Sequence, residues 1–419
     1  MTIVYKFGGA SIKDVESIKN INSILERYDG ERLVIVFSAI GKVTNMLERL
    51  VDLYFNKHAD YILEFDKLKD FHYSIANKLF KHDHHVFDEI NNLFIEMEWI
   101  LEEEPVKTYS FIYDQIVSFG EHLSCKIISA HLNATGFSNE FIDARDMICT
   151  DDNFRNAKID WEKTTESIQR NVSKNHCVIQ GFIGVNSENY TTTLGREGSD
   201  FTAAILAYVL NANKVVIWKD VPGMMNADPK YFPNAKLLSN ISFDEAIELA
   251  FFGAKVIHPK TLQPLKKKNI PLRVRSFLNL DEEGTLINSD ITNLSKKPCY
   301  IVKDNQMLIS ISDVNLSFII EDHMSAIFLL LSKHALSVNM MQNSAISFSI
   351  CIDNDKYKTP NLINDLKKKF KVFYNENLTL YTIRNYTKDL EKELFNNKKV
   401  FLEQKSRNNL QIVARIEEK

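Results

Sequence analysis

The sequence contains few cysteines and lacks several patterns that define large classes of protein. Its five cysteines are far apart in 419 residues and include no CxxC pair, which indicates a reduced, cytoplasmic protein with buried thiols. No run of about 18 apolar residues could span a membrane, and the N-terminus lacks the charged-then-apolar pattern of a signal peptide. A net charge of -4 gives no electrostatic footprint for nucleic acid. We therefore expect neither a membrane nor a nucleic acid as partner.

One histidine-rich stretch, HDHH at 82–85, could suggest a metal site. Histidine and aspartate side chains bind metals, but no other stretch of the chain completes a set of ligands here. We interpret the stretch as an exposed loop and assign no residue of the chain as a metal ligand.

The first part of the chain alternates predicted strands and helices. Continuous apolar runs are typical of strands that are buried on both faces of a parallel sheet. Residues 52–112 are polar and aromatic with helical spacing, which indicates a helical excursion from that sheet. We predict a doubly wound, mostly parallel α/β domain over 1–292. Its clearest strands are expected at 33–40, 175–186 and 213–221, and its clearest helices at 199–210 and 243–252.

The pattern changes near residue 290, where LINSDITNLSKKP is polar and without period, as in a domain linker. The remainder, 298–419, predicts a smaller α+β region built of two weakly repeated modules, the second of them short. The first module is expected to have strands at 307–320 and within 337–353, with helices at 324–336 and 361–370. The second is expected to have strands at 378–385, near 399–403 and at 409–414, with a helix at 386–397.

The stretch YKFGGAS near the N-terminus combines a lysine, two glycines and a helix start. Glycine pairs leave backbone N–H groups uncovered, and a following helix directs its positive end at whatever lies above the loop. Ser11, with Asp14 three residues later, is typical of a helix N-terminus. The spacing is not that of a Walker loop. The stretch predicts either a phosphate site around Lys6, Gly8 and Gly9 or a plain tight turn.

Further stretches place glycine beside charged or hydroxyl side chains at the ends of predicted elements. In one of them, a glycine–serine turn begins a helix and forms a second candidate anion site. Each stretch alone could equally hold a surface charge, a structural salt bridge or a turn. The stretches are SAIGKVTN with Ser38 and Thr44, SFGEHLS with Glu121, TLGREGSDFTAA with Arg196 and Asp200, and the pair WKDVPGMMNADPK (218–230) and FGAKVIHP (252–259).

Together and in this order, these motifs resemble aspartate kinase of the amino-acid kinase superfamily, and the modules after residue 297 resemble ACT domains. Related kinases of acetylglutamate, glutamate, carbamate or UMP share the sheet. The resemblance implies phosphoryl transfer from ATP, with Mg²⁺, to L-aspartate, giving 4-phospho-L-aspartate for the synthesis of lysine, threonine, methionine and isoleucine. It also implies a homodimer formed through the ACT-like region. Two alternatives stay open: a catalytically weak amino-acid sensor, and a kinase of another amino acid.

The resemblance implies a role for each motif residue. Lys6 would pair with the transferring phosphate, whose oxygens the loop of Gly8 and Gly9 would hold. Asp200 would orient the attacking groups, either through magnesium or through Lys6. For the substrate aspartate, the planar guanidinium of Arg196 would bind the α-carboxylate, and the carboxylate of Glu121 would bind the α-ammonium. Hydrogen bonds to the substrate would come from Ser38, Thr44 and Ser199, and nucleotide contacts from Lys219, Asp220, Met225, Lys230, Lys255 and Val256.

Several positions depart from the family pattern. Glu197 stands where a small residue is usual, and Lys219 replaces a threonine. Met225 replaces a tyrosine, and the soft methionine can still pack against a base. In the ACT-like region, Asn339 replaces a frequent aspartate and cannot neutralise the ammonium of an effector such as lysine. Two further departures are Ala10 in place of threonine and the absence of glycine from IEDHMSA (320–326).

Overall fold

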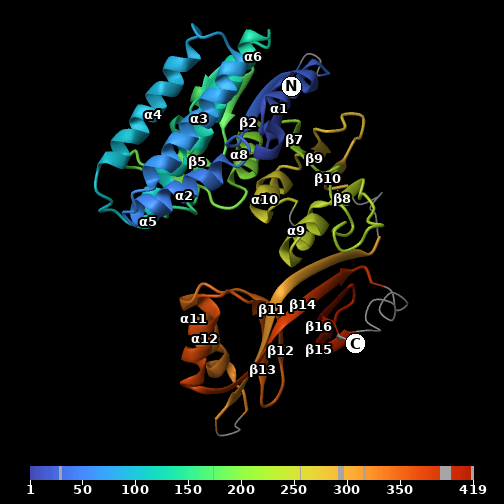
Figure 1. Cartoon of the computed structure of the whole chain (residues 1–419). Helices are drawn as coiled ribbons and strands as arrows, with labels where there is room; N and C mark the ends of the chain where they lie inside the picture. Colours follow the sequence, from blue (N-terminus) through green and yellow to red (C-terminus); the bar gives the residue numbers. More distant parts are fainter. Residues whose placement is uncertain are drawn as a thin grey trace. The chain divides into compact units, whose positions relative to one another are not determined.

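The computed structural model describes residues 1–27, 31–172, 174–254, 256–290, 297–314, 318–386 and 398–416. The chain forms two compact units (Figure 1). The first unit comprises Met1–Met224, Leu237–Ala250 and Lys255–Ser295, and the second comprises Met225–Lys236, Phe251–Ala254 and Lys296–Lys419. The predicted boundaries at 292 and 298 stay a prediction.

The first unit is built on an eight-stranded sheet with the order β3-β4-β2-β1-β7-β9-β10-β8. All neighbours in the sheet are parallel except β9 and β10. A separate two-stranded ribbon, β5-β6, follows β4 in the chain. The strands are β1 (Thr2–Phe7), β2 (Arg32–Phe37), β3 (Glu140–Ile142), β4 (Cys177–Gln180), β5 (Ile183–Val185), β6 (Thr191–Thr193), β7 (Lys214–Lys219), β8 (Asn240–Ser242), β9 (Leu272–Ser276) and β10 (Thr285–Asn288).

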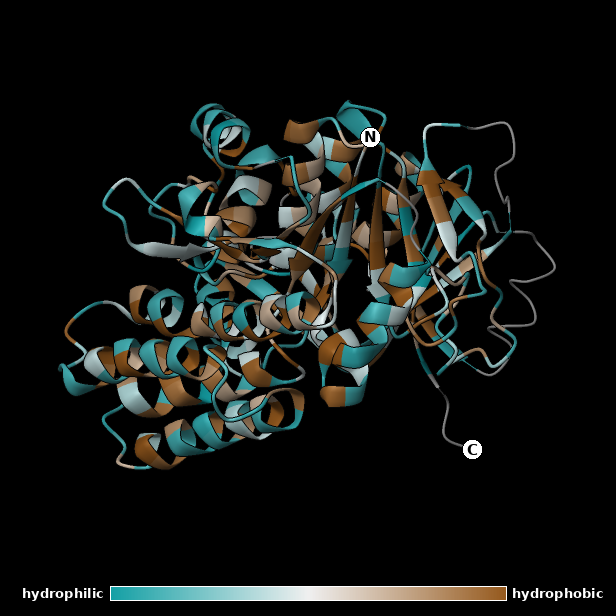
Figure 2. Cartoon of the chain, turned by 90° about the horizontal axis from the view of Figure 1, so that it is seen from above, coloured by the Kyte–Doolittle hydropathy of each residue, from teal (hydrophilic) through white to brown (hydrophobic). Residues whose placement is uncertain are grey.

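Strand β1 shows how the sheet separates its two faces. Ile3, Tyr5 and Phe7 belong to one large apolar core shared with helices α1 and α6. Because successive side chains of a strand point to opposite faces, Val4 and Lys6 lie on the other face, where α8 packs against β1. Figure 2 shows these apolar strands in brown between helices that carry teal, hydrophilic residues. The alternation therefore places the Lys6 side chain beside α8.

Helices surround the sheet and also extend away from it. Residues 52–112, for which the sequence predicts an excursion, fall within the run from α2 to α5. The helices are α1 (Val15–Glu26), α2 (Val43–Phe55), α3 (Tyr61–Leu79), α4 (Val86–Glu102), α5 (Tyr109–Val117), α6 (Phe119–Ala134), α7 (Trp161–Asn171), α8 (Gly198–Leu210), α9 (Phe243–Phe252) and α10 (Pro259–Lys267), with short 3₁₀ helices η1 (Gly9–Ile12) and η2 (Ala144–Asp146).

Two local predictions for the first unit are corrected. Helix α1 is capped by Asp14, whose carboxylate accepts the Ser17 N–H at 2.8 Å, and not by Ser11, whose hydroxyl donates to the Gly8 carbonyl within η1. The single strand expected at 175–186 is broken after β4. There Gly181 lies so close to the start of α8 that a Cβ on it would come within 2.4 Å of the Ser199 Cβ. The chain must turn aside at this point, so the strand ends.

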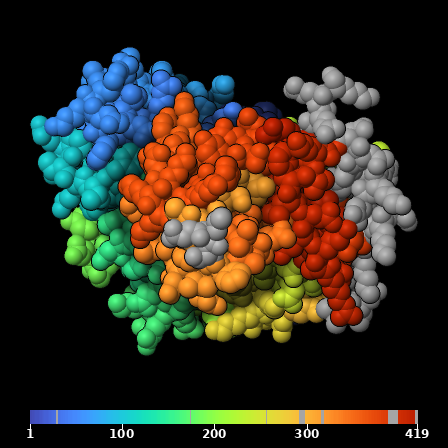
Figure 3. Space-filling view, turned by 90° about the horizontal axis from the view of Figure 1, so that it is seen from below, coloured from blue at the N-terminus to red at the C-terminus, as the bar shows by residue number. Residues whose placement is uncertain are grey.

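The second unit is a six-stranded antiparallel sheet with the order β12-β13-β11-β14-β16-β15. Helices α11 and α12 cover one face and share an apolar core with β11 and β13. Figure 3 shows the surface of this unit in orange and red. The elements are β11 (Cys299–Asp313), α11 (Glu321–Lys333), β12 (Val338–Asn343), β13 (Phe348–Asp353), α12 (Lys358–Lys367), β14 (Phe370–Arg384), β15 (Lys398–Lys405) and β16 (Asn409–Ile416).

The two predicted modules share this one sheet, because the long strands β11 and β14 pair with each other. The first predicted strand runs too far, since β11 ends at Asp313. The helix expected at 361–370 is observed as α12, three residues earlier, because Phe370 already pairs in the sheet with Asp313. Residues 387–397 of the helix predicted at 386–397, and the centre of the predicted linker, 291–296, lie outside the described residues.

Candidate active site

A pocket of about 490 Å³ opens in the first unit at the carboxyl ends of its parallel strands. Lys6 and Lys219 are at or near the ends of β1 and β7, and Ser38 follows β2. Ligands of doubly wound sheets bind at this edge. Of the residues that the sequence analysis singles out, the pocket brings together Lys6, Gly9, Ser38, Thr44, Glu121, Arg196, Glu197, Ser199, Asp200 and Lys219.

An ion pair between Lys6 and Asp200 lies in the wall of this pocket. The Lys6 Nζ is 2.5 Å from Oδ1 of Asp200, and both side chains are buried. Burial alone would raise the pKa of Asp200, but Lys6 and Lys219 together hold that pKa below its ordinary value. Asp200 is therefore an anion at neutral pH, and it fixes the position of the Lys6 ammonium at the end of β1.

Lys219 completes the arrangement from the other side of Asp200. Its Nζ is 3.2 Å from Oδ2 of Asp200 and donates to the Val256 carbonyl at 2.5 Å. Burial would lower the pKa of Lys219, yet the nearby Asp200 and Glu197 carboxylates raise it. One buried carboxylate thus holds two ammonium groups at the pocket, a charge arrangement suited to phosphate oxygens.

The glycine loop packs closely against the loop after β2. A Cβ on Gly9 would lie 2.6 Å from the Gly41 carbonyl oxygen and 2.9 Å from that of Ala39, so only glycine fits there. The N–H of Gly41 donates to the Gly9 carbonyl at 3.1 Å. This contact places the KFGG and SAIGKVTN motifs side by side along the pocket.

Glu121 lies in the first turn of α6 and is almost fully buried. One carboxylate oxygen, Oε1, accepts the Ala39 N–H at 3.2 Å, while Oε2 has no hydrogen-bond partner among the described residues. Burial raises the pKa of Glu121 to about 8, although Ala39 and Lys6 act in the opposite direction. A buried carboxyl group with one unsatisfied oxygen is poised to receive a cation.

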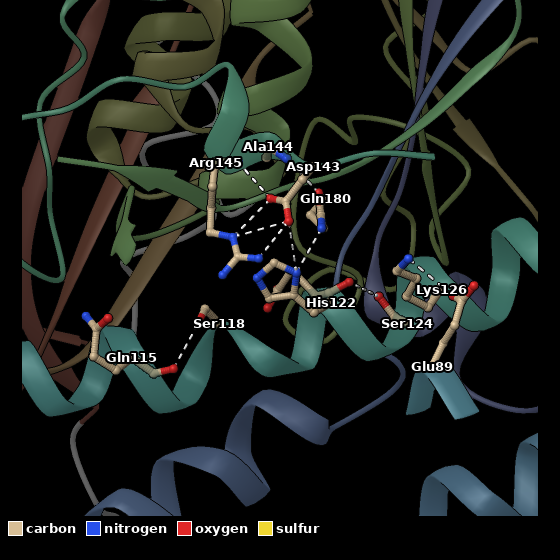
Figure 4. Close-up of polar contacts among 11 residues, drawn as sticks. Glu89, Gln115, Ser118, His122, Ser124, Lys126, Asp143, Ala144, Arg145 and Gln180 are labelled. Carbon is tan, nitrogen blue, oxygen red and sulfur yellow. Dashed lines mark hydrogen bonds and ion pairs between the residues drawn. The ribbon is translucent and has the colours of Figure 1, made fainter. Parts of the chain in front are cut away.

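Neighbouring polar contacts hold α6 in place (Figure 4). Nδ1 of His122 accepts from the Gln180 amide at 2.9 Å, and Oε1 of Gln180 accepts the Ala144 N–H at 2.8 Å. Burial lowers the pKa of His122 to about 4, so its ring is neutral at pH 7. The Ser124 hydroxyl donates to the Ser38 carbonyl at 2.7 Å. These bonds fix Glu121 relative to the ends of β2 and β4.

The TLGREGSD motif forms the start of α8. Glu197 is the residue before the helix and has a φ of 54°, in the left-handed region that favours glycine. Its Oε2 is buried without a hydrogen-bond partner in the described part of the chain, and burial raises its pKa. Arg196 is exposed at the pocket. The conformation explains why a small residue suits position 197.

The remaining predicted nucleotide residues are not brought into this pocket. Asp220 is exposed just beyond β7. Met225 and Lys230 belong to the second unit, and Lys255 lies outside the described residues. Val256 contributes its carbonyl oxygen to Lys219. Gly8 adjoins the pocket through Lys6, whose Nζ would lie 3.3 Å from a Cβ on that glycine. Their nucleotide roles stay predictions.

Sequence reasoning missed another part of the pocket wall, formed by Glu48, Tyr113 and Arg155. It also missed Asp114, a fully buried carboxylate that accepts hydrogen bonds from the backbone of Arg155 and Thr193. Burial raises the pKa of Asp114 to about 6. The available signal was a single acidic residue within the largely apolar run IYDQIV (112–117), just beyond the predicted helical excursion.

Two observations concern metals and membranes. In the part of the chain that the structure describes, no group of three or more histidine, cysteine, aspartate or glutamate side chains could hold a metal ion. The HDHH stretch lies in the loop between α3 and α4. None of the helices within the described ranges has the length and apolar character needed to cross a bilayer.

The chain resembles known proteins over nearly its full length. The sequence profile of the amino acid kinase family matches residues 1–276. Lysine-sensitive aspartokinase 3 of Escherichia coli is 30% identical over 410 residues, which cover 95% of this chain and 90% of that protein. Chloroplastic aspartokinase 2 of Arabidopsis thaliana is 30% identical over 398 residues, or 88% of this chain and 71% of that protein.

Solved structures agree with these relatives. The E. coli aspartokinase III complex with aspartate and ADP matches with a TM-score of 0.84 at 28% identity, covering 99% of this chain and 96% of that one. Clostridium acetobutylicum aspartate kinase matches with a TM-score of 0.78 at 26% identity, covering 98% of this chain and 96% of that one. The predicted fold class, a mostly parallel α/β sheet followed by a smaller α+β region, is confirmed. The chain belongs to the amino acid kinase family and, within it, to the aspartokinases.

Proposed function

We propose that the chain is an aspartate kinase, which transfers the γ-phosphoryl group of ATP to the β-carboxylate of L-aspartate and forms 4-phospho-L-aspartate. The observation that carries this proposal is the pair of ammonium groups, Lys6 and Lys219, held on either side of Asp200 in a pocket that also contains Glu121 and Arg196. The similar structure of E. coli aspartokinase III was solved in complex with aspartate and ADP.

Lys6 positions the transferring phosphoryl group and neutralises its charge. Phosphoryl transfer depends on positioning and on neutralising the charge of the transferring group. A Lys6 ammonium fixed by Asp200 does both without reorganising during the reaction. Asp200 acts through Lys6 as a positioning residue, and no general base is needed because the attacking β-carboxylate is already ionised near neutral pH.

The substrate end of the pocket provides complementary charges. The Arg196 guanidinium binds the α-carboxylate through its planar fork. Glu121 binds the α-ammonium and loses its proton as it does so, because a cation beside it favours the charged form. Hydroxyl groups of Ser38, Thr44 and Ser199 supply hydrogen bonds. The reacting carboxylate is thereby directed toward Lys6.

The nucleotide brings its own metal in this proposal. Both oxygens of Asp200 face lysines, and no group of three or more acidic, histidine or cysteine side chains that could hold a metal ion occurs among the described residues, so we assign no magnesium site to the protein there. Mg²⁺ would arrive with ATP and would neutralise part of the charge of the phosphates. Asp220, Met225, Lys230, Lys255 and Val256 are proposed to contact the nucleotide.

We further propose a cytoplasmic homodimer formed through the second unit, the ACT-like region. Large apolar side chains are exposed on α11 and β12, among them Leu329, Phe328 and Met341, at 72%, 42% and 49% exposure. Exposed apolar patches of this kind mark association surfaces. All five cysteines are described and none forms a disulfide, as expected in a reducing compartment. Light scattering of the purified protein would measure its mass.

The activity is tested by trapping the product. The purified protein is incubated with MgATP, hydroxylamine and a panel of acidic amino acids, and the hydroxamate is measured. L-aspartate should give product well above the control without amino acid. Folded protein that forms none would contradict the kinase and favour an amino-acid sensor, and a preference for another amino acid would change the substrate.

A further inference from the structure

We propose that Arg155 is a second guanidinium for the substrate's non-reacting carboxylate, acting together with Arg196 as a determinant of specificity. This inference rests on the proposed function, because it assigns one more contact to the same amino-acid substrate. Arg155 lies in the loop between η2 and α7, lines the pocket and is exposed to solvent.

The Arg155 side chain lies on an aromatic support. Its guanidinium carbon is 4.5 Å from the centre of the Tyr113 ring and 5.4 Å from that of Tyr109. The Tyr113 hydroxyl donates to Glu48 at 2.6 Å, which fixes the ring and engages one acidic side chain of the pocket wall. Stacking on a ring face holds a guanidinium in place and leaves its N–H groups available for a planar anion.

The backbone of Arg155 is in a conformation that favours glycine. Its φ is 69°, in the left-handed region. The Asp114 carboxylate stabilises this conformation by accepting the Arg155 N–H at 3.1 and 3.0 Å. A large side chain at such a position, directed to a pocket, is the kind of local strain that functional sites retain.

Asp114 also connects Arg155 to the loop of Arg196. The same carboxylate accepts the Thr193 N–H at 2.8 Å and the Thr193 hydroxyl at 2.7 Å, two residues before Gly195. A Cβ on Gly195 would lie 3.1 Å from the carbonyl oxygen of Arg155, so the two loops are in contact. One buried carboxylate therefore fixes both arginine-bearing segments.

The charges of the pocket leave these two arginines for the substrate. Lys6 and Lys219 are both bound to Asp200. Among the residues that the structure describes, neither Arg155 nor Arg196 forms an ion pair with a carboxylate, although the charge of Arg155 opposes the rise in the pKa of Asp114. An amino acid with two carboxylates then presents the reacting one toward Lys6 and the other to the two guanidinium groups.

The test compares L-aspartate with its α-amide, which keeps the β-carboxylate and the α-ammonium but lacks the second negative charge. KM and kcat for both substrates, and KM for ATP, are measured for the wild type, Arg155→Gly and Arg155→Lys. Lys57→Gly is the matched control, because Lys57 is an exposed cation with a φ of 55° outside the pocket. Thermal unfolding of each variant checks its fold.

We expect Arg155→Gly to raise the KM for aspartate about tenfold, as for loss of one charge-assisted contact, and to change the KM for the α-amide less than about twofold. Its unfolding temperature should equal or exceed that of the wild type, because glycine adopts this φ without strain. Arg155→Lys should give an intermediate KM for aspartate. It replaces Arg155→Gly in the comparison if the glycine variant does not fold. Lys57→Gly should leave all of these kinetic constants unchanged.

Equal effects on both amino-acid substrates, no effect on either, or an effect on the KM for ATP alone would overturn the role of Arg155. A wild-type protein that does not phosphorylate aspartate would instead overturn the proposed function, and this inference with it. The wild-type measurement therefore separates the two failures.

Discussion

The ammonium of Lys6, on β1, lies 2.5 Å from the carboxylate of Asp200, on α8, although 194 positions separate them in the chain. The contact exists because strand alternation turns Lys6 to the face that α8 covers. Asp200 in turn binds Lys219 at the end of the neighbouring strand β7. Removing any one of Lys6, Asp200 and Lys219 changes the electrostatic environment of the other two.

Replacing Lys6 should affect the chemical step. Lys6→Ala removes a fixed positive charge from the transferring phosphoryl group, so kcat should fall by about two to three decades with a smaller change in the KM for aspartate. Lys6→Arg should rescue little, because a planar guanidinium does not replace a compact ammonium beside Asp200. Steady-state kinetics measure both. The control is Lys19→Ala, an exposed lysine of α1. A rise in KM alone would assign Lys6 to substrate binding.

Replacing Arg196 should affect substrate binding instead. Arg196→Ala removes a contact made in both the ground state and the transition state, so the KM for aspartate should rise with kcat little changed. A charge-assisted bond to a carboxylate is worth about 1.5–3 kcal/mol, which corresponds to roughly one to two decades. An unchanged KM would remove Arg196 from the substrate site.

Glu121 should make aspartate binding depend on pH. Its pKa of about 8 in the folded protein means that aspartate binding requires loss of a proton below that pH. The KM for aspartate should therefore fall as pH rises from about 6.5 to about 8.5, and Glu121→Gln should raise the KM and remove the slope. A slope that persists in Glu121→Gln would assign it to another group.

The same group has an opposite effect on folding. Its pKa in the folded state is raised from the ordinary 4.5, so between that pH and about 8 the folded protein holds a proton that the unfolded chain has lost. The contribution of Glu121 to stability is therefore complete below pH 4.5 and declines as pH rises toward about 8. Denaturant unfolding of the wild type and Glu121→Gln across this range would measure the difference.

Glu197→Gly should increase the stability of the protein and lower its KM for ATP. Glycine adopts the left-handed φ of 54° without strain, and the change removes a buried carboxylate beside Asp200. We expect a stability gain of about 1 kcal/mol and a lower KM for ATP, because a negative charge leaves the phosphate pocket. Asn211→Gly, at the other end of α8 with a φ of 47°, should change stability alone. Equal KM values in the two variants would show that Glu197 faces away from the nucleotide.

Lysine should inhibit weakly at concentrations near those of aspartate. The polar atoms of Asn339 are already engaged: Oδ1 accepts from Lys303 at 2.8 Å, and the amide donates to Gln306 and Asp353 at 2.8 and 2.9 Å. A neutral side chain with these partners does not offer a carboxylate to an effector ammonium. Initial rates over a lysine series test this. Strong saturable inhibition would place the effector contacts elsewhere.

Much of the fold follows from local pattern, because helix α9 begins and ends where the apolar period of 243–252 predicts. Positions set by distant contacts were not predictable in this way. The strand break after β4 depends on how closely α8 approaches Gly181. Lys219 could be associated with the site by its motif, but its bond to Asp200 depends on the order of strands in the sheet. Arg155 reaches the pocket through a bond to Asp114, 41 positions earlier.

The pairing of strands β11 and β14 has consequences for how the second unit unfolds and how it tolerates truncation. Each is 15 residues long, and they pair along most of that length, so the two ACT-like modules are joined through a shared backbone ladder. The unit should unfold in one cooperative step and not module by module. A shortened gene product that ends before Phe370 would leave β11 with an open edge, which is a template for aggregation. Strand β14 therefore both covers the edge of β11 and joins the two modules.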